Sequence, residues 1–157
     1  MTNLSGISEQ LQMGKAGEHL VCYSLILQGY NAFLSDAGLP YDILVEVDGA
    51  LKRVQVKSSV SARCVYSNGY SKTYAYAFML RAGKGAKRCI KQTDVDYIAF
   101  AFLDIGVVQY LPTKDLTDRQ TGNLIQGVQF HKRRGKYVIG KFNTLESSLY
   151  KKKVKLF

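Results

Sequence analysis

The sequence predicts an α/β fold, with a mixed central sheet flanked by helices, and three features carry this prediction. Apolar residues recur at helical spacing over 8–28, as expected for an N-terminal helix. A β-hairpin is expected over 41–58, where two apolar-rich runs flank Asp48-Gly49. Two further apolar runs within 95–111 have the length of buried strands. Together they indicate a sheet led by the hairpin and covered by the helix.

Size and charge favour one domain with a polyanionic partner. The 157 residues are enough for a single core, so we expect one domain over 1–157, with a core at about 8–115 and a basic extension at 116–157. Apolar residues at 46% and charged residues at 22% are ordinary for a globular protein. Because 22 Lys and Arg face 12 Asp and Glu, the formal charge is +10, which favours nucleic acid.

Patterns for targeting, membrane crossing and zinc binding are missing from the sequence. Residues 1–10 lack the basic and apolar regions of a signal peptide, and no apolar run approaches the ~18 residues of a membrane span. We therefore expect a cytoplasmic protein with no membrane partner. Cys22, Cys64 and Cys89 are widely spaced and odd in number, so we interpret them as reduced residues that mostly pack.

The first helix is expected to begin after Ser8, a plausible N-cap, and to end at Gly29. One stripe at helical spacing holds Ala16, Leu20, Tyr23 and Leu27. Glu18 lies on the neighbouring stripe with Val21, Cys22 and Leu25, so it points toward apolar surface. An ordinary surface glutamate is the alternative interpretation. Gly14 and Gly17 would let another backbone or a ligand come close.

Hairpin register brings polar residues together. A two-residue loop places Asp42 opposite Gln55, with Lys57 two residues further on the same face. A four-residue loop would instead set Asp42 opposite Lys57, and a one-residue slip would send Asp42 to the other face. Because Pro40 lacks an N–H, Asp42 should lie near the beginning of its strand, at the rim of the sheet.

These polar residues suggest a site for a hard divalent cation, because a half-buried carboxylate is costly without a partner. Asp42 could supply a carboxylate oxygen, Gln55 its amide oxygen and Val56 its backbone carbonyl, while Lys57 could polarise a water beside a phosphate. The alternative is the ordinary solvated face of a half-exposed hairpin.

The remainder of the chain offers strands and basic loops. A second hairpin is expected around Asn68-Gly69, a short turn or helix from Thr113, a hairpin turning at 133–136 and a helix over 144–150. Aromatic and basic residues in these segments are candidates for nucleic-acid binding, although tyrosine is also simply a good strand residue. The candidates are Arg63, Tyr66, Tyr70, Lys72, Lys84, Lys87, Arg88, Lys132, Arg133 and Arg134.

A glutamate on a helix, then Pro-Tyr-Asp, then Gln-Val-Lys is an order that resembles the PD-(D/E)XK nuclease superfamily. More narrowly, GKAGEHLVCYSLILQGY, LPYDILVEVDGALKRVQVKSS and DVDYIAFAFLDIGVVQYLP resemble its group I intron-associated homing endonucleases, over about residues 13–115. The resemblance implies a magnesium-dependent phosphodiesterase centre formed by Glu18, Asp42, Gln55 and Lys57. Most members have Asp or Glu where this chain has Gln55, which removes one negative charge from the site.

We therefore expect an endodeoxyribonuclease that hydrolyses phosphodiester bonds in double-stranded DNA with Mg²⁺, or alternatively Mn²⁺, held by Asp42, Gln55, Val56 and Glu18. A site-specific homing endonuclease is the leading hypothesis. Since one such centre cuts one strand, a homo-oligomer, a dimer or larger, is expected. The alternatives are a nucleic-acid-binding module that keeps the fold without cleavage, and a Holliday-junction-resolvase-like nuclease.

Overall fold

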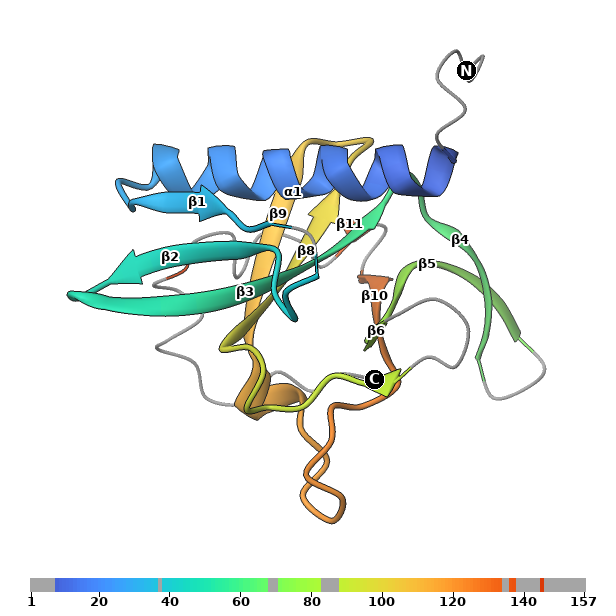
Figure 1. Ribbon diagram of the computed structural model, residues 1–157. Helices are drawn as coiled ribbons and strands as arrows, with labels where there is room; N and C mark the ends of the chain where they lie inside the picture. The colour runs from blue at the N-terminus through green and yellow to red at the C-terminus, as the bar shows by residue number, and fades with distance from the viewer. Residues whose placement is uncertain are drawn as a thin grey trace.

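Two sheets and a helix make up most of the part of the chain that the computed structural model describes, residues 8–36, 38–67, 71–82, 88–133, 136–137 and 145. Helix α1 (Glu9–Leu27) lies across one face of a five-stranded sheet of order β1-β2-β3-β8-β9 (Figure 1). A four-stranded sheet, β11-β10-β5-β4, and the pair β6-β7 complete the fold. The strands are β1 (Ala32–Leu34), β2 (Ile43–Val47), β3 (Ala50–Ser59), β4 (Arg63–Ser67), β5 (Ser71–Met79), β6 (Arg81–Ala82), β7 (Arg88–Cys89), β8 (Tyr97–Phe102), β9 (Val107–Pro112), β10 (Gly127–Arg133) and β11 (Lys136–Tyr137), and η1 (Thr113–Leu116) is a short 3-10 helix.

Helix α1 begins and ends where the sequence predicts. The Ser8 hydroxyl accepts a hydrogen bond from the Leu11 N–H at 3.3 Å, and Gly29 follows the helix with a φ of +90°. The buried face, however, is that of Gly17, Val21 and Leu25. The stripe of Tyr23 and Leu27 is 60% and 69% exposed, so it is not the packing face. Which stripe of the helix is buried therefore depends on the side chains that lie beneath the helix, and not on how apolar the stripe is.

The first hairpin has the predicted two-residue loop. Asp48 and Gly49 have φ values of 51° and 73°, both positive as a type I′ turn requires, and Val47 pairs with Ala50. The ladder runs back to Ile43 opposite Val54, so the predicted even register is confirmed. Strand β3 continues beyond β2 and pairs in parallel with β8, whereas the other pairs of this sheet are antiparallel. The sheet is therefore mixed, as expected.

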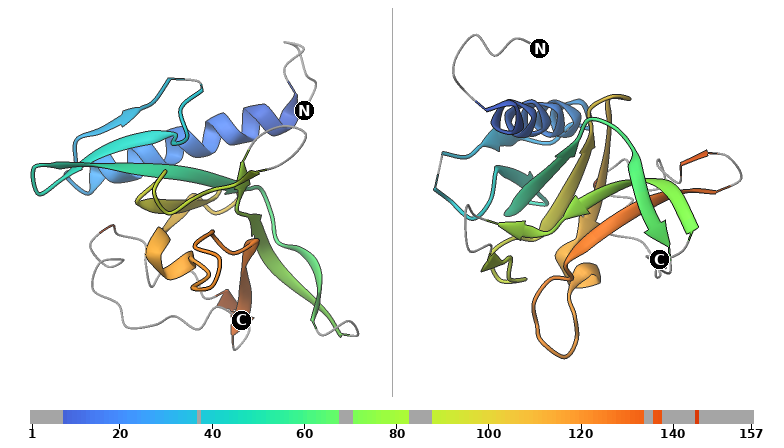
Figure 2. Two further views of the ribbon diagram at one scale, coloured as in Figure 1. Left: turned by 60° about the horizontal axis from the view of Figure 1, so that its bottom comes forward. Right: turned by 90° about the vertical axis from the view of Figure 1, so that its right-hand side faces the viewer.

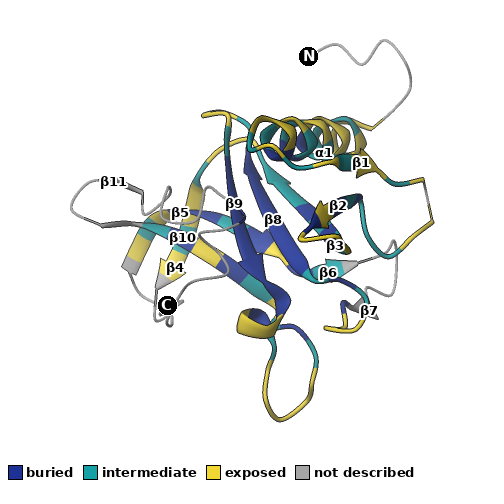
Figure 3. Cartoon of the chain, turned by 90° about the vertical axis from the view of Figure 1, so that its left-hand side faces the viewer, coloured by how far each residue is buried: buried dark blue, intermediate teal, exposed yellow. Residues whose placement is uncertain are grey.

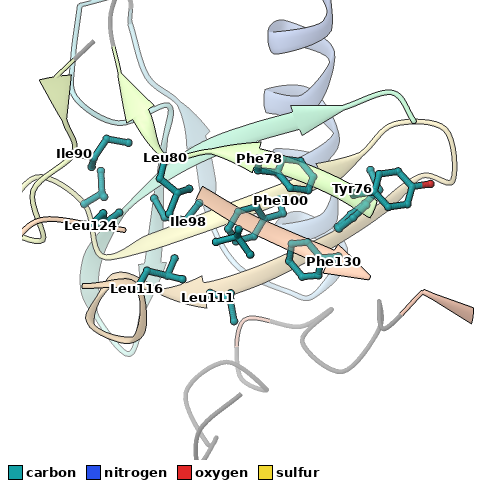
Figure 4. Packing of buried hydrophobic residues seen from close by; sticks show 13 residues of the cluster. Tyr76, Phe78, Leu80, Ile90, Ile98, Phe100, Leu111, Leu116, Leu124 and Phe130 are labelled. Carbon is teal, nitrogen blue, oxygen red and sulfur yellow. The ribbon is translucent and has the colours of Figure 1, made fainter. Parts of the chain in front are cut away.

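Strand β8 is buried along its whole length because both of its faces are covered (Figure 3). Its Ala99 and Ala101 face α1, where the core includes Val21, Leu25, Ile43, Val45, Val54, Val56 and Tyr110. Its Phe100 and Phe102 face the second sheet and make edge-to-face ring contacts with Phe78 and Phe130 at 5.1 to 5.3 Å between centroids (Figure 4). A layer of rings thus joins the two sheets.

The expectation of flanking helices holds for one face only. Among the described residues α1 is the one α-helix, because the second face of the central sheet is covered by β5 and β10 instead. The predicted helix over 144–150 lies outside the described residues, apart from Leu145, which is buried and donates its N–H to the Gln28 amide oxygen at 2.9 Å.

The two later hairpins form as the sequence predicts. Strand β4 pairs with β5 around the expected turn, whose residues 68–70 lie outside the described ranges, and Arg133 of β10 pairs with Lys136 of β11. Strand β10 contacts β5 only along Ala75 to Met79, so the outer part of the β4–β5 hairpin is a two-stranded ribbon. This ribbon extends away from the rest of the molecule (Figure 2).

Ionisation of Tyr110 should limit stability in alkali. Its buried hydroxyl donates to the Ser24 Oγ at 3.0 Å and so joins β9 to α1, and burial raises its pKa to about 12. A raised folded-state pKa gives stability that is complete below the unfolded value of about 10 and is lost as the pH rises through 12. Urea unfolding between neutral and alkaline pH should show that Tyr110→Phe loses less stability in this window than the parent, by on the order of 2 kcal/mol. Parallel losses in the two proteins would contradict this assignment.

Candidate active site

Asp42 is fixed in place by backbone hydrogen bonds on both sides. It directly precedes β2, its N–H donates to the Val54 carbonyl at 2.9 Å, and its own carbonyl accepts from the Ser35 N–H at 2.9 Å. The side chain therefore emerges at the rim of the sheet, next to the part of β3 that runs on without β2 beside it. This is the location that the preceding proline predicts.

The carboxylate of Asp42 is bound by two neighbouring residues of β3. Its Oδ2 accepts a hydrogen bond from the Val56 N–H at 2.7 Å and another from the Gln55 amide nitrogen Nε2. Both bonds follow from the register, because Asp42 and Gln55 are the next residues along the two chains beyond the Ile43–Val54 pair. No described residue donates to the other carboxylate oxygen, Oδ1, and the Gln55 oxygen is on the amide branch that does not meet Asp42.

Lys57 shares the face of β3 that carries Gln55, but its ammonium is anchored elsewhere. Its Nζ donates to the backbone carbonyl of Arg81, at the beginning of β6, at 3.0 Å. The contact spans 24 positions of sequence, so no local pattern could have revealed it. The Arg81 side chain adds a second feature that the sequence did not reveal: its Nε is buried and finds no acceptor among the described residues.

Glu18 reaches the site from α1. Its side chain is only 15% exposed and makes an ion pair with Lys15 at 2.6 Å. The helix approaches β3 closely because residue 17 is glycine: a Cβ there would lie 1.8 Å from the Ser58 Oγ and 2.9 Å from the Ser58 Cβ. Gly17 thus makes the close approach that the sequence suggests, whereas a Cβ on Gly14 would meet nothing within 4 Å.

Burial dominates the electrostatics of Asp42. It raises the pKa of this carboxyl, and the nearby Glu18 carboxylate raises it further, while the Val56 N–H and the charges of Lys57 and Lys15 oppose the shift. Two carboxylates and two ammonium groups therefore interact across the site. An approaching cation would reverse the burial effect on Asp42, because it would stabilise the ionised form.

The oxygen atoms present fit a hard cation. Within the described ranges, no three residues among His, Cys, Asp and Glu gather to hold a metal ion. Glu18 and Asp42 are supplemented by the Gln55 amide oxygen and the Val56 carbonyl. In a strand the N–H and C=O of one residue point to the same side, so this carbonyl points, like its N–H, toward Asp42. An all-oxygen set of this kind suits Mg²⁺ or Mn²⁺ and not zinc.

The β4–β5 ribbon displays part of the predicted nucleic-acid-binding set. Tyr66 is 65% exposed and lies opposite the exposed Lys72, while Tyr74, 60% exposed, lies opposite Cys64 on the same face. Arg63 is exposed on this ribbon. Tyr70, Lys84, Lys87 and Arg134 lie outside the described residues, and Arg88, Lys132 and Arg133 are placed by backbone alone, in β7 and β10.

The side chains of two of the three cysteines are described, and both are free thiols. Cys22 is partly buried, as expected of a packing residue, and burial raises its pKa. Cys64 is exposed on β4, so the expectation that the cysteines mostly pack is wrong for this residue. Among the described residues no helix is both long enough and apolar enough to cross a membrane.

Comparison with known proteins identifies the family. A family model described as PD-(D/E)XK endonuclease matches residues 8–139, and the chain belongs to this family. Among solved structures, the bacterial homing endonuclease I-Ssp6803I is similar, with a TM-score of 0.54 over 80% of this chain and 77% of that one. Their sequences are 19% identical, so this similarity shows a shared fold. A search of curated proteins finds no match.

The two helical glycines should respond in opposite ways to alanine. Gly17→Ala should destabilise the protein by about 1–3 kcal/mol, because its Cβ would overlap Ser58. Gly14→Ala, the matched control, should be neutral or stabilising by roughly 0.5–1 kcal/mol. Urea unfolding measures both. Adding Ser58→Ala to Gly17→Ala should restore part of the loss, and equal effects of the two glycine changes would refute the close-approach explanation.

Proposed function

We propose that this member of the PD-(D/E)XK endonuclease family is a Mg²⁺-dependent endodeoxyribonuclease that cuts double-stranded DNA at a specific site, as a homing endonuclease does. One observation carries the proposal. The hairpin register places Asp42 beside Gln55, with Lys57 on the same face of β3, and Gly17 brings the Glu18 helix onto that strand. The fold shared with a bacterial homing endonuclease supports the same conclusion.

The ion would be held by Asp42, Glu18, the Gln55 amide oxygen and the Val56 carbonyl. When bound, a divalent ion supplies Lewis-acid chemistry that favours attack of water on phosphorus. The ordering of Asp42 by Val56 and Gln55 fits this role, because the carboxylate is already oriented before a cation arrives. A preorganised ligand avoids the cost of rearrangement during the reaction.

Lys57 has the role of stabilising charge on the phosphate or of orienting the attacking water. Its anchor on the Arg81 carbonyl holds the ammonium at a defined place at the site, instead of letting it collapse onto Asp42. A fixed positive charge stabilises the developing negative charge without a cost in reorganisation. Arg81 therefore positions Lys57 through its backbone, so substitution of the Arg81 side chain leaves this particular contact in place.

DNA affinity would come from a separate part of the molecule. With a formal charge of +10, the chain can bind DNA through phosphate contacts, and the ribbon with Arg63, Tyr66 and Lys72 is an exposed surface for them. Since one such centre cuts one strand, a double-strand break would require at least a dimer, and two-fold symmetry would then predict paired half-sites.

Cleavage of target-bearing duplex DNA should require a divalent ion. The parent should nick or cut it with Mg²⁺ or Mn²⁺ and leave it intact in EDTA. Asp42→Ala should abolish cleavage while duplex binding, measured in EDTA, stays nearly unchanged, because phosphate contacts supply affinity separately. Loss of cleavage in EDTA with intact binding supports the enzyme. Binding without cleavage under every divalent condition would instead favour the non-catalytic module on the same fold.

Gln55 tests the site most sharply, because it serves both as a donor to Asp42 and as a neutral ligand. Gln55→Ala should slow cleavage at least tenfold, about 1.4 kcal/mol of barrier. Gln55→Glu should tighten ion binding, since it adds a negative charge, and should lower stability without an ion, since it replaces the donor to Asp42 with a like charge. Single-turnover rates at limiting Mg²⁺ decide the matter: a Gln55→Ala rate equal to that of the parent would make Gln55 a bystander.

A further inference from the structure

An ion pair with Lys15 engages Glu18, one of the ligands of the proposed site. The Lys15 Nζ lies 2.6 Å from the Glu18 Oε2. The lysine is 55% exposed, but the glutamate side chain is only 15% exposed, so the pair is not an ordinary solvent-exposed one. The Glu18 carboxylate that the proposed function assigns to a cation is therefore bound by an ammonium group of the same helix.

Helix stability does not account for this pair. Lys15 precedes Glu18 by three residues, which is the less favourable order for an ion pair on a helix. The more relevant neighbours are the other charged groups of the site.

Charges across the site balance without an external ion. Asp42 and Glu18 are negative, Lys15 and Lys57 are positive, and Asp42 feels all three of the others. Glu18 in turn raises the pKa of Lys15, so this lysine is held in its charged form. Had residue 55 been an acid, as in most of the superfamily, a third negative charge would have outweighed the two lysines.

We propose that Lys15 is an internal counter-ion that competes with a divalent cation for Glu18, so that the cation binds the Glu18 carboxylate only by displacing the ammonium. The inference rests on the proposed function, because it concerns the same site. It makes Lys15 a residue that sets the affinity for the ion and not a ligand. In the free protein the site then holds a divalent ion loosely.

Mn²⁺ binding to the purified 157-residue chain, without DNA, tests the competition. Free Mn²⁺ is counted by electron paramagnetic resonance during a titration. Lys15→Met should bind Mn²⁺ about three- to tenfold more tightly than the parent, because a competing charge beside Glu18 is gone. Lys15→Arg should match the parent. Lys114→Met, which removes the same charge from an exposed position on η1, should also match it.

A double-mutant cycle separates competition for Glu18 from general repulsion. In the Glu18→Gln background, Lys15→Met should give no gain in Mn²⁺ affinity. An equal gain in that background, an equal gain from Lys114→Met, or no binding by the parent and Lys15→Met up to about 10 mM Mn²⁺ (roughly 2.7 kcal/mol of binding free energy) would each overturn the inference. A chain that shows the predicted Mn²⁺ pattern but never cuts DNA would refute the proposed function alone.

Discussion

The two-residue loop at Asp48-Gly49 is the constraint on which the rest of the site depends. Both residues adopt positive φ, which few residue pairs tolerate, and the resulting type I′ turn permits one register of β2 against β3. Because side chains alternate along a strand, that register decides which face of the sheet each side chain occupies. It places Val54 and Val56 under α1 and Gln55 opposite Asp42. A slip of one residue would expose the valines and bury the amide, so the core and the site enforce the same pairing.

Strand β3 has a double role because it is longer than its hairpin partner. Up to Val54 it is paired with β2, and beyond that point its free edge offers the Val56 N–H to Asp42, while its other edge is paired in parallel with β8. The site therefore lies where an antiparallel partner ends and a parallel one continues. Gly17 adds the third element, since only a residue without a side chain lets α1 approach Ser58 so closely. Backbone geometry, more than the acidic residues themselves, brings Glu18 toward Asp42.

The sequence could predict the parts of this arrangement that depend on local rules. A turn signal, a period of two and a proline at the strand start are local, and they were enough to place Asp42 opposite Gln55. Helical spacing alone could not decide which apolar stripe of α1 packs: the structure buries Val21 and Leu25 and leaves Tyr23 exposed. The bond from Lys57 to the Arg81 carbonyl could not be predicted, since it depends on how β6 returns to the central sheet. The spacing of Lys15 and Glu18 was visible, but its meaning required the burial of Glu18.

The amide at position 55 explains how the site can be folded and half-buried without a cation. A buried carboxylate is costly unless its oxygens are satisfied, and the Gln55 NH₂ group supplies Asp42 with a donor that a glutamate or an aspartate could not supply. With glutamine at position 55 the site has two carboxylates, and the ammonium groups of Lys15 and Lys57 balance their charge. In the proposed site, stability without an ion and affinity for an ion would therefore be opposed at Glu18, because a cation would have to displace the Lys15 ammonium that satisfies this carboxylate in the free protein. Under the proposed function, a DNA phosphate would add negative charge beside these lysines and would so favour the cation when substrate is present.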